Sequence, residues 1–122
     1  GRFSSMYKPF HLIGMELNTS IFSAAILKKA TGHTKEFFGD VVATAKQNLK
    51  RGQILDGEGG FTVWGKLYPA EVAKKINGLP IGLANNVKLK NDIEKDQPVC
   101  WSDVEPDLGC PVVQIREKMQ LG

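Results

Sequence analysis

The spacing of apolar residues predicts a helix near the start of the chain. Between residues 12 and 30 they recur every three or four positions, at Ile13, Leu17, Ile21, Ala24 and Leu27. That spacing places them on one face of a helix. Lys28 and Lys29 suit the negative end of the helix dipole, and Gly32 stands where a left-handed helix stop belongs. The pattern therefore predicts a helix over about residues 12–30.

This predicted helix is hydrophobic on more than one side. A second set of apolar residues falls outside the first stripe: Met15, Phe22, Ala25 and Ile26. A helix on the surface of a small domain needs only one apolar stripe. We therefore expect the helix to need a second partner to cover it.

After Gly39 the pattern changes to short runs of β-prone residues separated by turn signals such as Asp-Gly, Gly-Gly and Asn-Gly. Such runs predict short strands joined by tight turns, with bulges where glycine interrupts them. The predicted strands are 41–46, 61–67, 81–84, 86–90, 98–101 and 111–115.

One short helix interrupts this series near residues 69–76. Pro69 suits the first helical position, Glu71 lies in the first turn, and Gly78 follows as a stop. The prediction is thus a mainly β fold that carries this helix and the N-terminal one.

An internal repeat links the two halves of the β-rich part. Shifting the sequence by 44 positions aligns KQNLKRGQIL, residues 46–55, with KNDIEKDQPV, residues 90–99. In this alignment Leu49 matches Ile93, and Gly52 faces Asp96. The repeat predicts two similar hairpin-like units packed about a pseudo-twofold axis, each supplying half of a core that neither could close alone.

Composition agrees with a small globular domain rich in turns. The 122 residues include 13 Gly and 6 Pro, and 42% are hydrophobic. The net charge of +3 divides into +2 over residues 1–40, +4 over 41–95 and −3 over 96–122. Because the basic residues are spread among turns and not clustered with aromatic residues, a nucleic-acid partner is not expected.

The two cysteines, Cys100 and Cys110, are spaced too widely for a CxxC redox pair and lack nearby zinc ligands, since His11 and His33 are far away in sequence. They are expected to be free, partly buried thiols, although a disulfide would be possible. The sequence contains no secretory segment and no long apolar span. We therefore expect a cytoplasmic protein without a membrane partner.

The most distinctive candidate site is the loop DGEGG at residues 56–60. Asp56 and Glu58 could accept hydrogen bonds from sugar or polyol hydroxyls, and Gly59 and Gly60 would let a ligand approach the backbone closely. The alternative is a tight connection in which Asp56 caps a turn and the glycines supply positive φ angles. Trp64 and Lys66 on the following strand complete this candidate ligand or interface surface. No catalytic, cofactor-binding or metal-ligating residue is predicted.

The repeated pattern resembles the SAF domain, a β-clip module. The resemblance lies in VVATAKQNLKRGQILDGEGGFTVWG followed by LPIGLANNVKLKNDIEKDQPVCWSDV, and covers about residues 40–104. The sequence departs from the family pattern at Asp96, where the family often has Gly, and at Pro98, which begins the predicted strand 98–101. The resemblance implies a β-clip domain over residues 40–122, including a C-terminal extension.

A second, narrower resemblance spans nearly the whole chain. YKPFHLIGMEL, GHTKEFFGDVVATAK, LDGEGGFTVWGKLYPA and LPIGLANNVKLK look like the C-terminal part of bacterial NAD(P)-dependent oxidoreductases of the homoserine-dehydrogenase-like family, some of which are deoxyxylulose-phosphate-reductoisomerase-like. In that family a Rossmann domain comes first, a catalytic and dimerisation region second, and a SAF domain last. The resemblance implies that residues 1–39 are the tail of the catalytic region.

This resemblance also implies the function and the partners. The domain would help to shape the substrate site or the oligomer of a parent enzyme, next to the preceding Rossmann and catalytic domains of the same chain and in a homo-oligomer. NAD(P) and a small-molecule substrate would belong to the parent. The chain itself has no GxGxxG motif at a helix start, and GEGG cannot replace it. No cofactor is therefore expected on this chain, and no catalysis by it alone. The alternative is a self-sufficient SAF module that binds a carbohydrate or sugar phosphate.

Overall fold

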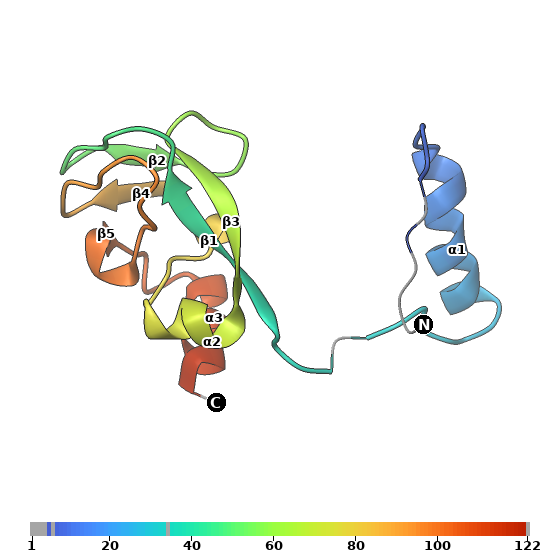
Figure 1. Ribbon diagram of the computed structural model, residues 1–122. Coiled ribbons are helices and arrows are strands. Elements are labelled where there is room, and N and C mark those ends of the chain that lie inside the picture. Colours follow the sequence, from blue (N-terminus) through green and yellow to red (C-terminus); the bar gives the residue numbers. More distant parts are fainter. Residues whose placement is uncertain (1–4, 6, 34, 122) are drawn as a thin grey trace. The chain divides into compact units, whose positions relative to one another are not determined.

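The computed structural model describes residue 5 and residues 7–33 and 35–121 (Figure 1). The chain forms two compact units that meet between Glu36 and Phe37. Each unit is described by itself below.

The first unit contains one helix, α1, Ile13–Ala25. Glu16 in its first turn accepts a hydrogen bond from the backbone N–H of Leu12, at 3.0 Å, which satisfies one of the free donors at the helix start. None of the residues of α1 is buried within the unit. The helix is thus a local structure whose apolar side chains face solvent.

Helix α1 is shorter than the predicted range of 12–30. The backbone turns left-handed at Lys28, with φ of 53°, and this position takes the role that the sequence assigned to Gly32. A reciprocal contact closes the turn, because the Ser23 hydroxyl donates to the carbonyl of Lys29 and the Lys29 N–H donates back to that of Ser23. The two lysines therefore follow the helix and do not form its last turn.

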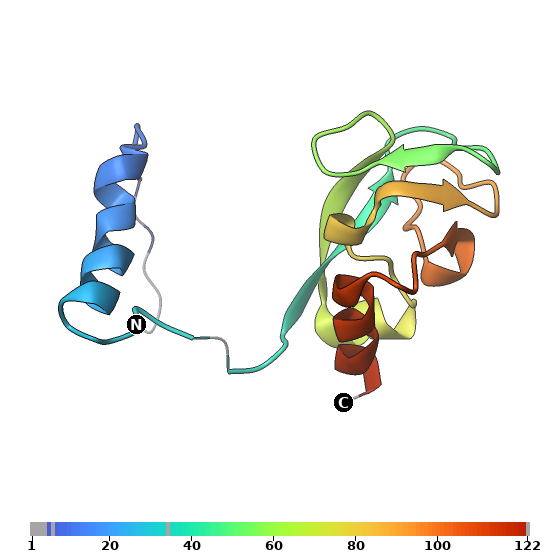
Figure 2. The same ribbon diagram turned by 180° about the vertical axis from the view of Figure 1, so that it is seen from behind.

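The second unit is the β-rich domain. Two strands form an antiparallel ribbon, with β1, Gly39–Ala45, beside β3, Val63–Pro69. Three form a second antiparallel sheet in the order β2, β4, β5, with bounds Ile54–Asp56, Asn85–Leu89 and Val104–Glu105. The remaining elements are α2, Ala70–Lys75, the 3-10 turns η1, Ile81–Leu83, and η2, Trp101–Asp103, and α3, Pro111–Leu121. In both views the loop between β2 and β3 lies at the end of the domain opposite to α2 and α3 (Figures 1 and 2).

The core of this domain draws on both sequence repeats. Its buried side chains come from strands β1 to β5 and from the segments that connect them: Ala43, Ala45, Leu49, Leu55, Val63, Leu79, Ala84, Leu89, Ile93, Val99 and Val104. The predicted mainly β fold is confirmed, and so is the short helix near residues 69–76, which is α2.

Three predicted strands are corrected by the structure. Within the predicted strand 81–84, Ile81–Leu83 form the 3-10 turn η1, because the N–H groups of Leu83 and Ala84 donate to the carbonyls of Pro80 and Ile81 and not to a neighbouring strand. Residues 98–101 form only single bridges, through Pro98 to Thr44 and through Cys100 to Gly78. Residues 111–115 are not a strand but the first turns of α3.

The helical start at Pro111 overrides the β-branched residues that follow it. Proline suits the first position of a helix, and the strong helix formers Arg116, Glu117 and Lys118 come next. Among residues 111–119 of α3, the buried ones are Val113 and Arg116, three positions apart. The helical period therefore decides which side chains are covered.

The predicted pseudo-twofold arrangement is confirmed by the backbone. Leu49 and Ile93 lie opposite each other in an antiparallel bridge. The Ala45 N–H donates to the carbonyl of residue 97, at 3.0 Å, and the Ala45 carbonyl accepts the N–H of residue 96, at 2.9 Å. Leu89 is the equivalent residue 44 positions later. Its N–H donates to the carbonyl of residue 53, at 2.9 Å, and its carbonyl accepts the N–H of residue 52, at 2.8 Å. The two halves of the repeat thus make matching hydrogen bonds.

Candidate functional site

Asp56 of the predicted loop serves the structure of the loop itself. Its carboxylate accepts the backbone N–H groups of Phe61, at 2.6 Å, and Thr62, at 3.0 Å, and it also accepts the Thr62 hydroxyl. These bonds, the hydroxyl of Thr62 first, lower the pKa of Asp56 to about 2. The carboxylate is therefore ionised and accepts three internal hydrogen bonds, as expected of a turn cap.

The glycines of this loop also have structural causes. Gly57 and Gly59 adopt φ of 72° and 78°, where side chains are disfavoured. A Cβ on Gly60 would lie within 2.5 Å of the Asp56 carboxylate. The loop thus matches the turn-cap interpretation, and Asp56, Glu58 and Phe61 are exposed.

Trp64 and Lys66 lie on the same face of the β1–β3 ribbon, opposite Thr44 and Val42. Trp64 is 39% exposed, and the Lys66 ammonium lies over the Tyr68 ring, 5.4 Å from its centre. Among the described residues, no hydrogen bond or ion pair connects either side chain with the 56–60 loop. The role of these residues and of Glu58 in ligand binding stays a prediction.

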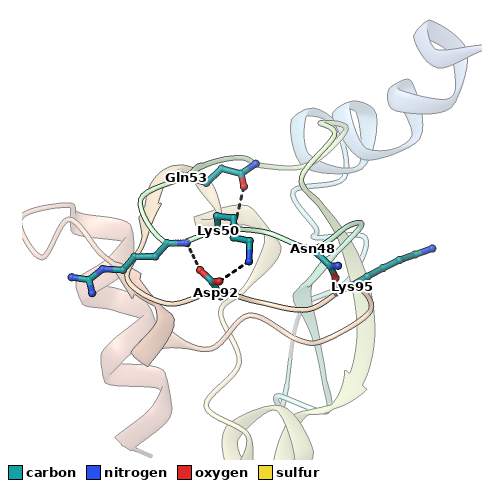
Figure 3. A network of polar contacts seen from close by, with 6 residues as sticks. Asn48, Lys50, Gln53, Asp92 and Lys95 are labelled. Atoms are coloured by element: carbon teal, nitrogen blue, oxygen red, sulfur yellow. Dashed lines mark hydrogen bonds and ion pairs between the residues drawn. The ribbon is translucent and has the colours of Figure 1, made fainter.

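The two basic turns of the repeat form a polar network around Asp92 and Asn48 (Figure 3). Asp92 accepts the backbone N–H of Arg51, at 2.8 Å, and pairs with the Lys50 ammonium, at 2.8 Å. Asn48, its equivalent in the repeat, accepts the backbone N–H of Lys95, at 2.9 Å. The Lys50 ammonium lowers the pKa of Asp92. The network thus closes the two turns onto each other.

The cations of these turns do not converge on one point. The Lys95 side chain extends away from Asp92 and Lys50 (Figure 3). Lys50 is already paired with Asp92. This arrangement supports a solvated surface better than a site for one phosphate group.

Cys100 and Cys110 are free and half-buried, as the sequence predicts. Burial, with the nearby Asp103 carboxylate, raises the pKa of the Cys100 thiol, so this thiol is less reactive than an ordinary one. Within residues 7–33 and 35–119, no cluster of three or more His, Cys, Asp or Glu side chains could hold a metal ion.

A cavity of about 420 Å³ is the site that the sequence analysis missed. One wall is η1 and the start of β4, with Leu83, Asn85 and Val87. Trp101 and Glu105 form the second wall. The third is the segment from Pro106 to Val113, which leads into α3. The first wall is far in sequence from the other two, so the cavity exists only in the folded domain.

A buried ion pair fixes α3 beside this cavity. The Arg116 guanidinium on α3 contacts the Asp40 carboxylate on β1, and both side chains are more than nine-tenths buried. The guanidinium also stacks on Phe37, 4.9 Å from the ring centre. Removing either residue would leave the other charge buried without a partner, which is strongly destabilising. The ion pair therefore holds α3 in place.

Together these features define a small β-clip domain that is built from two related hairpin units and carries a C-terminal helix. The SAF domain family model matches residues 40–105, more than half of the chain. The chain therefore belongs to the SAF domain family, and the resemblance seen in the repeat is confirmed. No curated protein matches the chain.

Within the described part of the chain, no helix is long and apolar enough to cross a membrane.

Proposed function

We propose that this chain is the C-terminal SAF region of an NAD(P)-dependent oxidoreductase of the homoserine-dehydrogenase-like family. In this proposal the domain helps to shape the substrate site or the oligomer of the parent enzyme, and it is not catalytic alone. The proposal extends the SAF assignment by the sequence resemblance of residues 7–17, 32–46, 55–70 and 79–90 to that family.

The observation that carries this proposal is the apolar surface of α1. Large hydrophobic side chains point outward along the whole helix and the turn after it: Ile13, Met15, Leu17, Ile21, Phe22, Ile26 and Leu27, all at least 47% exposed. A contiguous apolar surface of this kind is typical of an interaction site. The catalytic and dimerisation region of the parent, in the same or a neighbouring subunit, is the proposed cover.

The residues of this chain do not fit a nicotinamide cofactor. The glycine-rich segment Gly57–Gly60 leads into strand β3 and opens no helix, so it lacks the helix dipole that a pyrophosphate site uses. Its neighbouring carboxylate, Asp56, would repel the phosphates. The cofactor would thus be held by the Rossmann domain of the proposed parent.

The test uses the complete reading frame that encodes this chain. The intact protein and a version ending at Glu36 would be compared for mass in solution, by light scattering, and for NAD(P)H-dependent turnover. The proposal predicts an altered oligomer or at least a tenfold loss of kcat/KM in the shortened protein. Unchanged mass and kinetics, or an intact protein without a dinucleotide-binding domain, would refute it.

The second candidate is a self-sufficient SAF module that binds a carbohydrate. It is favoured by one observation, the exposure of Glu58 beside the glycines and of Trp64 on the adjacent strand. The hydroxyl groups of a sugar could form hydrogen bonds beside Glu58 while one face of the sugar ring packs on the Trp64 indole. Titration of the chain with sugars and sugar phosphates, followed by tryptophan fluorescence in the wild type and in Trp64→Phe, tests this candidate. A saturable response that disappears in the variant supports it.

A further inference from the structure

The 420 Å³ cavity joins the SAF domain to a segment outside the matched family region. The family match ends at residue 105, whereas Pro106, Asp107, Cys110, Val112 and Val113 form one complete wall. The cavity is therefore a feature of this chain's own C-terminal extension. Its volume falls within the range of roughly 300–1,000 Å³ that is typical of small-molecule sites.

Hydrogen bonds within the extension shape its side of the cavity. Asp107 accepts the Gly109 N–H through its side chain, at 2.9 Å, and the Cys110 N–H through its carbonyl, at 3.1 Å. The Gln114 side-chain amide donates to the carbonyl of Leu108, at 3.0 Å. With the Asp40–Arg116 pair farther along α3, these bonds hold the third wall together.

The charges of the lining have one sign. Glu105 and Asp107 contribute two carboxylates, and no Lys, Arg or His belongs to the described lining. Lys88 lies opposite Glu105 in the β4–β5 register, but within the described residues it forms no ion pair with Glu105. The cavity is thus electronegative, which opposes phosphate and carboxylate ligands and attracts a cation.

The remaining lining is amphipathic. Asn85 and Asn86 offer amide oxygens as further acceptors, whereas Leu83, Val87 and Val112 supply an apolar surface. An ammonium group has three donors and no acceptor, so it matches carboxylates and amide oxygens. A carbon skeleton attached to it would cover the apolar surface.

We propose that this cavity binds a small organic amine, with its ammonium group between Glu105 and Asp107 and its carbon skeleton against Leu83, Val87 and Val112. The proposal is independent of the oxidoreductase assignment, because every residue it uses lies in the second unit of this chain. Its failure would therefore leave that assignment untouched.

Three probes of nearly equal shape test the charge preference on the full chain: benzylamine, benzyl alcohol and benzoate. Binding is followed by ¹⁵N-resolved NMR, with the indole signal of Trp101 as the cavity reporter and that of Trp64 as the reference outside it. We expect saturable shifts at Trp101 with benzylamine, at least a fivefold weaker affinity for benzyl alcohol, and no saturable shift with benzoate. Added salt should weaken amine binding.

Matched variants assign the effect to the cavity. Asp107→Asn keeps an oxygen for the Gly109 N–H but removes one charge, so it should weaken benzylamine binding at least fivefold while preserving the spectrum of the fold. Glu58→Gln removes a carboxylate outside the cavity and should leave the affinity unchanged. Glu105→Gln provides a second measurement if the turn is disturbed by the first variant.

Four results would overturn the proposal. These are equal affinity for benzylamine and benzyl alcohol, a preference for benzoate, no saturable shift at Trp101 with benzylamine, or tighter binding of glucose than of benzylamine at the same resonances. Equal loss of binding in Glu58→Gln and Asp107→Asn would likewise place the amine elsewhere.

Discussion

Leu49 and Ile93, which are 44 residues apart, donate their backbone N–H groups to each other's carbonyl oxygens, at 2.8 and 3.0 Å. They lie at the centre of the pseudo-twofold arrangement, and both side chains are buried in the shared core. On either side, Asn48 and Asp92 accept backbone N–H groups from the opposite turn. This bridge fastens the two halves of the SAF domain together.

Truncating either residue of this bridge should destabilise the whole domain. Leu49 is 1% exposed, and Leu49→Ala is expected to lower the free energy of unfolding by about 2–4 kcal/mol through lost burial and a cavity. Ile54→Ala is the control, since Ile54 is 57% exposed, and it should cost less than about 1 kcal/mol. Urea unfolding monitored by circular dichroism measures both. Similar losses in the two variants would contradict a shared core at Leu49.

The repeat also predicts a stabilising substitution at Asp96. Asp96 has a left-handed backbone with φ of 67°, and its equivalent Gly52 has φ of 85°. A left-handed conformation costs a residue with a side chain roughly 1–2 kcal/mol, partly offset by the entropy of glycine in the unfolded chain. Asp96→Gly should therefore raise stability by up to about 1 kcal/mol, and Gly52→Ala should lower it by about the same amount. Thermal unfolding tests both signs, and a lower melting temperature for Asp96→Gly would count against the equivalence.

The Asp56 cap should make stability depend on acid pH. Because its pKa in the folded state, about 2, lies below the ordinary 3.8, the carboxylate stabilises the fold fully above about pH 4. That contribution is lost as the pH falls toward 2. Since the carboxylate is exposed to solvent, we expect a loss of only about 1 kcal/mol.

The variant Asp56→Asn isolates this contribution. It should be less stable at pH 5 and should lose less stability than the wild type between pH 5 and pH 2. Glu58→Gln, in the same loop, should keep the wild-type pH dependence. Urea unfolding at several pH values measures the free energy of unfolding of each protein. The same pH dependence in wild type and Asp56→Asn would rule out a stabilising role of the Asp56 carboxylate.

Close packing at Gly78 gives a further prediction. A Cβ there would lie 2.7 and 2.8 Å from the two methyl carbons of Val42, which is completely buried on β1. Gly78→Ala should therefore cost about 1–3 kcal/mol through overpacking. At Gly82 a Cβ would meet no atom within 4 Å, so Gly82→Ala should be nearly neutral. Melting temperatures of the two variants measure the contrast, and a neutral Gly78→Ala would show that Val42 can move aside.

Much of the fold could be predicted because the sequence repeats itself. The alignment of Leu49 with Ile93 and of Gly52 with Asp96 predicted two equivalent units. The structure adds that the first pair forms a backbone bridge and that the second pair has a left-handed backbone. Local patterns failed where tertiary structure decides the conformation. Residues 111–115 are β-branched but continue a helix that begins at Pro111, and the helix of residues 12–30 ends early because the chain turns left-handed at Lys28.

The candidate sites were less predictable. The DGEGG loop was conspicuous in the sequence, yet the structure commits Asp56 to Phe61 and Thr62. The cavity was missed because its lining comes from residues 79–87, 101 and 105–113, which no spacing rule connects. The acidic excess over residues 96–122 was the only sequence signal related to it, since Glu105 and Asp107 contribute to that charge.

The most direct test of the proposed function is complementation in trans. The parent protein shortened to end just before Gly1 would be mixed with the separate chain of residues 1–122, so that α1 comes only from the added chain, and NAD(P)H-dependent turnover would be measured as the chain is added. We predict that the folded chain restores activity in a saturable manner, and that Leu17→Asp on α1 weakens this restoration at least tenfold. No restoration by a chain with a native circular dichroism spectrum would contradict the proposed role of this SAF domain.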